Sequence, residues 1–202
     1  MNNTLTPDKQ TLILDAAQMR FAHYGLGKVT MDEIATDLGI SKAALYYYFE
    51  TKEEIFRQVI AREQDVFINR IEAILKRKSA ASEKLLDYFH QHVILLDKLL
   101  NLKIISLQAD TALHPIIREL FHTFRSKELL FLESILSDGK AQKEFSLESP
   151  EKTASLLQHV LDGLRLRFFK TVKHQDIGET EVKLLAHEIK LFSKIFLRGI
   201  SH

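Results

Sequence analysis

The chain has 202 residues, of which 46% are hydrophobic and 27% charged, the composition of an ordinary folded protein of one or two domains. The absence of cysteine excludes disulfides, thiolate metal sites and cysteine nucleophiles, and it favours a reducing compartment. The net charge of +1 gives no sign of a nucleic-acid partner, so an argument for DNA binding has to rest on local pattern.

Export and membrane insertion are not expected. The first ten residues are polar and lack the apolar stretch of a secretory signal. No uncharged apolar run approaches the roughly 18 residues that a membrane span needs. We therefore expect a cytoplasmic protein with no membrane partner.

Apolar residues recur at helical spacing along nearly the whole chain, and alternating strand patterns do not occur. The sequence predicts an all-α fold of about nine helices. Thr6-Pro7 and Ser149-Pro150 each have the pattern of a cap followed by proline that opens a helix. We expect a loose polar connector over residues 137–149. The predicted helices span residues 7–24, 31–38, 42–47, 52–78, 83–100, 102–112, 116–137, 150–173 and 179–198.

The segment from Thr30 to Glu54 has the pattern of two short helices joined by a tight turn. Thr30 and Glu33 form a capping box that opens the first helix. Gly39 follows that helix, where a left-handed backbone is cheap only for glycine, and Ser41 caps the second. This arrangement is the helix-turn-helix unit, so the sequence predicts DNA binding within roughly the first fifty residues.

The second helix of this unit would be the reading helix. Small residues let a helix enter the major groove, and alanine and tyrosine offer apolar contacts to thymine methyl groups. Hydroxyl groups can donate to phosphates. Its outward residues would be Lys42, Ala43, Ala44, Tyr46 and Tyr47, with Leu45 and Phe49 in the core.

A second anion-binding helix start is expected just beyond the reading helix. Thr51 and Glu54 have the spacing of another capping box, and Lys52 adds a cation there. Residues 1–52 nevertheless hold five lysines and arginines against six acidic residues, so affinity for DNA of any sequence should be modest and sensitive to salt.

Residues 12–56 resemble the N-terminal domain of the tetracycline repressor (TetR) family. Tyr48 stands where family members often have histidine. The resemblance rests on residues matching in order at fixed spacing: Ile13-Leu-Asp-Ala-Ala17, Phe21, Tyr24-Gly25, Val29-Thr-Met31, Ile34-Ala35, Leu38-Gly-Ile-Ser41, Leu45-Tyr-Tyr-Tyr-Phe49 and Lys52-Glu53.

The resemblance implies roles for individual residues. Three consecutive tyrosines span about 200° of a helix and cannot all point the same way, so we expect at least two to face DNA. By resemblance, the phosphate contacts would be Thr30, Ser41, Tyr47, Tyr48 and Lys52, and the residues facing bases would be Lys42, Ala43 and Tyr46.

The resemblance also implies a helix-turn-helix domain over residues 1–52 and a larger helical regulatory and dimerisation domain over residues 53–202. A protein that reads half-sites usually needs two copies, which favours a homodimer. The alternative is that the last two helices pack only within one chain. The expected interface residues are Leu157, Leu164, Phe168, Leu185, Ile189, Phe192 and Phe196.

A ligand pocket in the second domain is expected to be mostly apolar with a few polar groups. Most of its candidates would also suit a packed core. Asp110 and His114 lie four residues apart, but two ligands before Pro115 make an incomplete metal site, so no metal or other cofactor is expected. The pocket candidates are Phe89, His92, Val93, Leu96, Gln108, Phe121, Phe124, Leu161 and Arg165.

Two functional interpretations remain open. The first is a repressor released from an operator palindrome by a small, mostly apolar ligand. The second is a DNA-binding regulator controlled by a protein partner or without a small ligand. We do not expect an enzyme, since the sequence contains no phosphate loop, no nucleophile elbow and no second histidine after His187-Glu188.

Overall fold

The computed structural model describes residues 8–98, 114–171 and 179–201. Within these ranges the chain forms helices and no strand, which confirms the predicted all-α fold. The predicted helix over residues 102–112 lies outside the described residues. The described helices are α1 (Lys9–Tyr24), α2 (Met31–Asp37), α3 (Lys42–Tyr48), α4 (Lys52–Leu75), α5 (Ala81–Lys98), α7 (His114–Ala141), α8 (Pro150–Thr171) and α9 (Glu179–Ile200).

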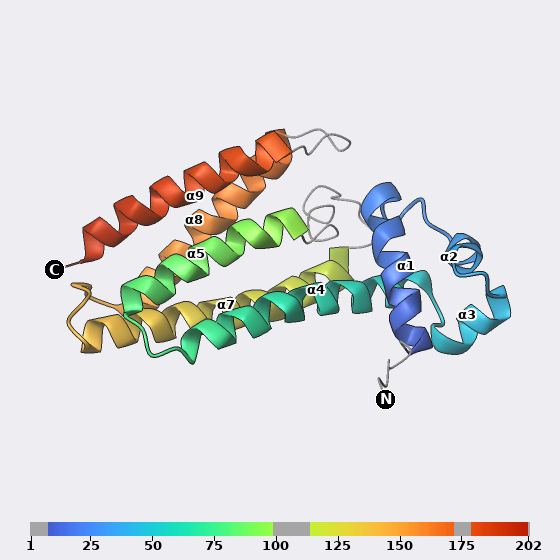
Figure 1. The fold of residues 1–202 in the computed structure, drawn as a ribbon, viewed down its shortest axis with the longest axis horizontal. Coiled ribbons are helices and arrows are strands. Elements are labelled where there is room, and N and C mark those ends of the chain that lie inside the picture. Colours follow the sequence, from blue (N-terminus) through green and yellow to red (C-terminus); the bar gives the residue numbers. More distant parts are fainter. Residues whose placement is uncertain (1–7, 99–113, 172–178, 202) are drawn as a thin grey trace, which may run out of the picture.

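The molecule is elongated, with α1, α2 and α3 gathered at one end (Figure 1). Helix α4 starts among these three helices and runs alongside α7. Helices α5, α8 and α9 complete the larger part, where α8 packs on α7 and α9 packs on α5. The C-terminal end of α9 lies far from α1–α3 (Figure 1).

The core of the N-terminal part extends into α4. Phe21 of α1 and Phe56 of α4 are buried and meet edge to face, with ring centroids 5.2 Å apart. Ile55, Val59 and Ile60 are fully buried in the same core cluster. The first turns of α4 therefore pack with the helices of the N-terminal part. We call residues 9–60 the head and the remaining described residues the body.

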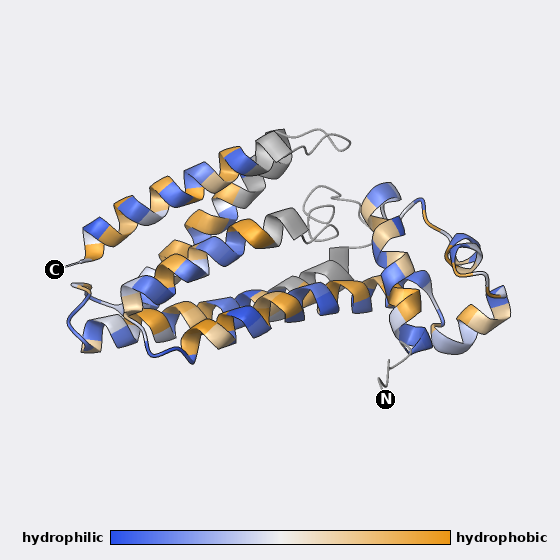
Figure 2. Ribbon diagram, viewed as in Figure 1, coloured by the Kyte–Doolittle hydropathy of each residue, from blue (hydrophilic) through white to orange (hydrophobic). Residues whose placement is uncertain are grey.

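The helices of the body bury one face each, as their sequence periodicity predicts (Figure 2). Large aromatic side chains from α4, α5 and α7 meet in the core between them. Phe67 of α4 has its ring centroid 6.3 Å from that of Tyr88 of α5 and 5.4 Å from that of Phe124 of α7. None of the described helices is long and apolar enough to cross a membrane.

The connector between α7 and α8 is ordered, so the prediction of a loose segment over residues 137–149 is wrong. Helix α7 continues to Ala141. Phe145 is buried, and the N–H of Ser146 donates to the carbonyl of Ile200 at 2.6 Å. The carboxylate of Glu144 accepts hydrogen bonds from the N–H groups of Ala81 and Ser82, at 2.8 and 3.0 Å. This polar stretch therefore ties the start of α5 and the end of α9 to the end of α7.

Candidate DNA-binding surface

The helix-turn-helix forms as its caps predict. The Thr30 hydroxyl accepts from the N–H of Glu33 at 3.3 Å, while the Glu33 carboxylate accepts from the N–H of Thr30 at 2.8 Å. Gly39 has φ of +63°, the left-handed conformation expected there. The Ser41 hydroxyl accepts from the N–H of Ala44 at 3.1 Å, which opens α3. These contacts place α3 across α2 at a fixed angle.

The second predicted capping box, at the start of α4, is only half formed. The Thr51 hydroxyl accepts from the N–H of Glu54 at 3.1 Å. The carboxylate of Glu54 does not return to Thr51, because it accepts from the side-chain amide of Gln58 at 2.9 Å and lies 3.6 Å from Arg57. The prediction is therefore correct for the threonine and wrong for the glutamate.

One side of α3 is open to solvent and the other is buried. Leu45 and Phe49 are in the core, as expected. Tyr46 is 44% exposed and Tyr47 84%, whereas Tyr48 is half-buried against the core. The rings of Tyr47 and Tyr48 meet edge to face with centroids 5.2 Å apart. Ser41, Lys42 and Ala43 are exposed on the same helix start, and Ala44 is half-buried.

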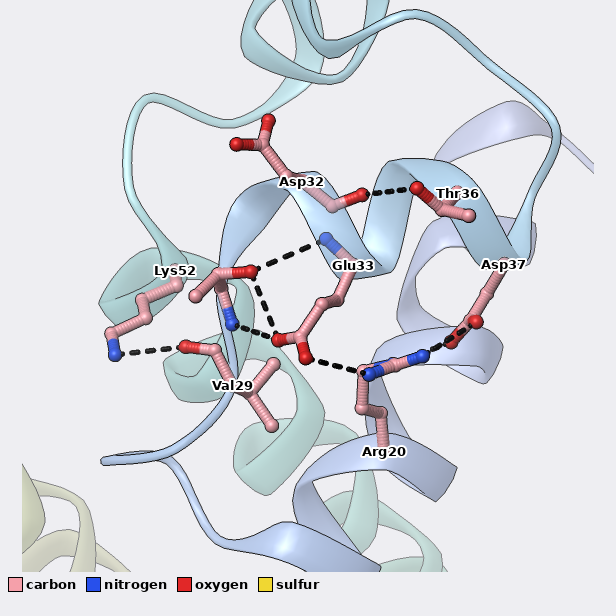
Figure 3. A network of polar contacts seen from close by, with 8 residues as sticks. Arg20, Val29, Asp32, Glu33, Thr36, Asp37 and Lys52 are labelled. Atoms are coloured by element: carbon pink, nitrogen blue, oxygen red, sulfur yellow. Dashed lines mark hydrogen bonds and ion pairs between the residues drawn. The ribbon is translucent and has the colours of Figure 1, made fainter.

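The acidic residues of α2 are paired inside the head (Figure 3). The Arg20 guanidinium binds Asp37 and lies 3.3 Å from Glu33. Hydrogen bonds from Arg20 lower the pKa of Asp37, and hydrogen bonds from Thr30 lower the pKa of Glu33. Two acidic side chains of α2 are therefore held by Arg20 of α1.

Two cations that were expected at DNA have partners within the head. The Lys42 ammonium donates to Asp32 at 2.8 Å, and this bond raises the pKa of Lys42. Lys42 and Asp32 are both largely exposed. Lys52 is half-buried, and its ammonium donates to the carbonyls of Leu26 and Val29, each at 2.9 Å. Figure 3 shows the contact with Val29. Lys42 can exchange its partner for DNA, whereas Lys52 is held by the backbone of the head.

Comparison with known proteins supports this interpretation of the head. Residues 13–59 match the family model described as bacterial regulatory proteins, tetR family. The chain is 30% identical over 135 residues to the fatty acid metabolism regulator protein of Bacillus subtilis, covering 65% of this chain and 68% of that protein. The chain belongs to the TetR family. It is a DNA-binding transcriptional regulator, as the helix-turn-helix predicted.

Two solved structures extend the likeness to nearly the full chain. A transcriptional regulator from Cytophaga hutchinsonii ATCC 33406 matches with a TM-score of 0.84 and 36% identity, covering 96% of this chain and 99% of that one. The regulator FadR from Bacillus subtilis, in complex with stearoyl-CoA, matches with a TM-score of 0.69 and 26% identity, covering 92% and 98%. The body therefore has the architecture of TetR-family regulators.

The candidate pocket residues that the structure describes lie in the core of this TetR-family body. The rings of His92 and Phe124 both contact Phe67, with centroids 5.0 and 5.4 Å from that of its ring. Phe89 turns instead toward Phe192 of α9, 5.8 Å away. Leu161 is buried and Val93 half-buried. The side chains of Leu96, Phe121, Arg165 and His114, and residues Gln108 and Asp110, lie outside the described part of the chain.

His92 forms a buried polar pair with Glu128, and of these two residues the sequence predicted only His92 as a site residue. The Nε2 atom of His92 lies 3.4 Å from a carboxylate oxygen of Glu128, and both side chains are at most 1% exposed. The ring of Tyr88 packs on His92 at 4.7 Å. Sequence analysis missed Glu128 because a single glutamate in a long amphipathic helix usually lies on the solvent side.

The expected dimer residues are largely used within one protomer. Leu157, Leu185 and Ile189 are at most 2% exposed, so a second copy could not reach them without rearrangement. Leu164, Phe192 and Phe196 are half-buried against the same core, and the Phe168 side chain lies outside the described residues. The exposed apolar residues of α8 and α9 are different ones: Leu156, Leu184, Leu191 and Ile195. Leu184, Leu191 and Ile195 are seven and four residues apart, a helical spacing that can be recognised in the sequence as a second apolar face of α9.

Proposed function

We propose that this TetR-family regulator is a homodimeric repressor that leaves its operator when a small, mostly apolar ligand binds in the body. The observation that carries the proposal is the outward face of α3, where a lysine, an alanine and two tyrosines are exposed beside a buried Leu45. Lys42, Ala43 and Tyr46 are assigned to base edges, and Thr30, Ser41 and Tyr47 to phosphates. The half-buried Tyr48 supports the ring of Tyr47.

Replacement of Tyr47 by phenylalanine tests the phosphate assignment. Tyr47 is 84% exposed, so loss of its hydroxyl leaves the core unchanged. A hydrogen bond to a charged phosphate contributes about 1.5 kcal/mol or more, so affinity for the intergenic DNA upstream of the gene should fall about tenfold. Tyr24→Phe, at an exposed tyrosine on α1, is the matched control. Equal affinity of both variants would count against the assignment.

The dimer is assigned to the outer faces of α8 and α9. Leu184, Leu191 and Ile195 are 53–64% exposed and follow one stripe of α9. Gly163 lies in the interior of α8, where a methyl group would meet nothing within 4 Å in the same chain. Glycine there costs helix stability, and the close approach of a partner helix would account for it.

Sedimentation of Leu191→Glu tests this interface. A charge at the centre of an apolar interface should convert the dimer into a monomer at micromolar concentration. Val66→Glu on α4 is the matched control. Val66 is 45% exposed, and α4 has no extensive packing against α8 or α9 in the described residues. A Leu191→Glu protein that remains dimeric would rule out this face.

The ligand is assigned to the region between α4, α5 and α7. Phe67, Tyr88 and Phe124 supply aromatic surface around the His92–Glu128 pair, which could orient the polar end of an otherwise apolar molecule. The likeness to a regulator that binds stearoyl-CoA supports this class. Stearoyl-CoA is therefore the first probe: it should raise the Tm of the protein and release it from DNA. If acyl-CoA thioesters of every chain length neither raise the Tm nor release the protein from DNA, the result would favour control by a protein partner.

A further inference from the structure

Lys52 occupies an unusual place for a cation. It is the first residue of α4, where the helix dipole presents partial positive charge and disfavours a lysine. Its ammonium is nevertheless half-buried and donates to the carbonyls of Leu26 and Val29. Among the described residues, no backbone N–H donates to either of these carbonyls, whereas the Lys52 ammonium donates to both. The side chains of Leu26 and Val29 are buried, so these carbonyls belong to a fixed part of the head.

The contact joins two helix starts. Val29 immediately precedes Thr30, the N-cap of α2, so Lys52 holds the beginning of α4 against the beginning of α2 (Figure 3). From Thr30 the contacts continue through Glu33 to Arg20 of α1, and from Arg20 back to Asp37 at the end of α2. We call this series of contacts the polar brace. It connects α4, α2 and α1.

We propose that Lys52 is a positioning residue of DNA reading, which sets the place of α2, and therefore of α3, relative to α4, and does not itself bind a phosphate. The inference rests on the proposed reading face of α3. Two of the three N–H groups of the ammonium already donate to neutral backbone acceptors, and these two bonds hold it against the head. Moving the ammonium toward DNA would leave a fixed carbonyl unsatisfied. A change in the direction of α4 would reach α2 through this contact as well as through the core.

The salt dependence of DNA binding separates positioning from phosphate contact. Each lost phosphate contact reduces the slope of log K against log salt by about 0.9. We expect Lys52→Gln to bind a labelled duplex of random sequence several-fold more weakly at every salt concentration, with the wild-type slope. On a duplex of random sequence, where no operator bases are read, the exposed Lys42 ammonium is expected to meet a phosphate. Lys42→Gln should therefore lower the slope by about one contact, and Lys127→Gln, at an exposed lysine of the body, should change neither quantity. A reduced slope for Lys52→Gln would overturn the proposal.

Hydrogen exchange without DNA gives a second, independent measurement. Lys52→Gln should speed amide exchange in residues 26–37 by several-fold, whereas Lys42→Gln should leave those amides protected as in the wild type. If Lys52→Gln does not fold, the salt dependence and the hydrogen exchange are measured on Lys52→Arg. Arginine keeps the charge but cannot place one ammonium between the two carbonyls. Wild-type protection in the folded variant would refute the inference. If α3 is not the reading face, Lys42→Gln would keep the wild-type slope, whereas Lys52→Gln would still exchange the amides of residues 26–37 faster than the wild type.

Discussion

Both carboxylate oxygens of Asp37, at the end of α2, accept hydrogen bonds from the Arg20 guanidinium of α1, at 2.5 and 2.7 Å. Bidentate pairs of this kind fix orientation as well as distance. Arg20 is 19% exposed and also lies near Glu33, so the pair is less screened than an ordinary surface contact. The position of α2 on α1 therefore depends on this pair as well as on the apolar core.

A double-mutant cycle on Arg20→Met and Asp37→Asn should give a coupling energy of up to about 1 kcal/mol in urea unfolding. The Arg77–Asp87 pair is the matched comparison, because a single close contact of 2.6 Å joins two side chains that are 57% and 43% exposed. Its coupling should stay below about 0.5 kcal/mol. Equal coupling energies for the Arg20–Asp37 and Arg77–Asp87 pairs would show that the Arg20–Asp37 pair stabilises the fold no more than an ordinary exposed ion pair does.

Asp32 should limit the affinity of the head for DNA of any sequence. Its carboxylate holds Lys42 and adds negative charge beside the proposed reading face. Asp32→Asn should raise affinity for a random-sequence duplex by about three- to fivefold at low salt, since it removes the repulsion and frees the ammonium for phosphates. Asp65→Asn, at an exposed carboxylate of α4, should change affinity little. Fluorescence anisotropy can measure both, and an Asp32→Asn protein with wild-type affinity would contradict the prediction.

Gly139 should tolerate no side chain. A methyl group there would overlap the ring of Phe145, which is 2% exposed and cannot move aside freely. Gly139→Ala should therefore destabilise the protein by about 1–3 kcal/mol, measured by urea unfolding. Gly27→Ala is the control, because a methyl group there meets nothing within 4 Å. Recovery of stability when Phe145→Leu is added would identify the overlap as the cause.

Glu144 should make the stability of the body depend on pH. Partial burial raises its pKa, but hydrogen bonds from Ala81 and Ser82 outweigh this effect and hold the pKa of Glu144 below its usual value. A lowered pKa means that the stabilisation is present above the unfolded-state value, near 4.3, and is lost as pH falls through the native value. Glu144→Gln should cost about 1–2 kcal/mol at pH 7 and progressively less below about pH 4. Glu148→Gln, at an exposed neighbour, is the control and should leave stability at pH 7 nearly unchanged.

The local signals of the head predicted its structure well. Thr30, Ser41 and Thr51 each cap a helix at the position that the sequence indicates. These signals succeed because a cap and its partner lie within three residues of each other. Lys52 shows where such reasoning stops. Spacing places a cation at a helix start, but only the fold brings the carbonyls of Leu26 and Val29 within its reach.

The body was harder to predict because its decisive contacts are distant in sequence. The polar connector is ordered by Glu144 contacting residues more than sixty positions away. Helix α9 carries apolar residues on two faces, one with Leu185 and Ile189 and one with Leu184 and Leu191. Periodicity identifies both faces but cannot say which one meets the protomer's own core. Three of the residues that the sequence predicts for the dimer, Leu157, Leu185 and Ile189, are buried within the chain itself.

Helix α4 has no break between the head and the body. Its 24 residues make a rod roughly 36 Å long, anchored at one end by Phe56 and at the other by Ile71 and Ile74. A tilt of about 5° at the body end would displace the head by about 3 Å, which is close to the rise of roughly 3.4 Å between successive base pairs. In the proposed dimer, a change of this size in the direction of α4 would move each head along the groove by about one base pair.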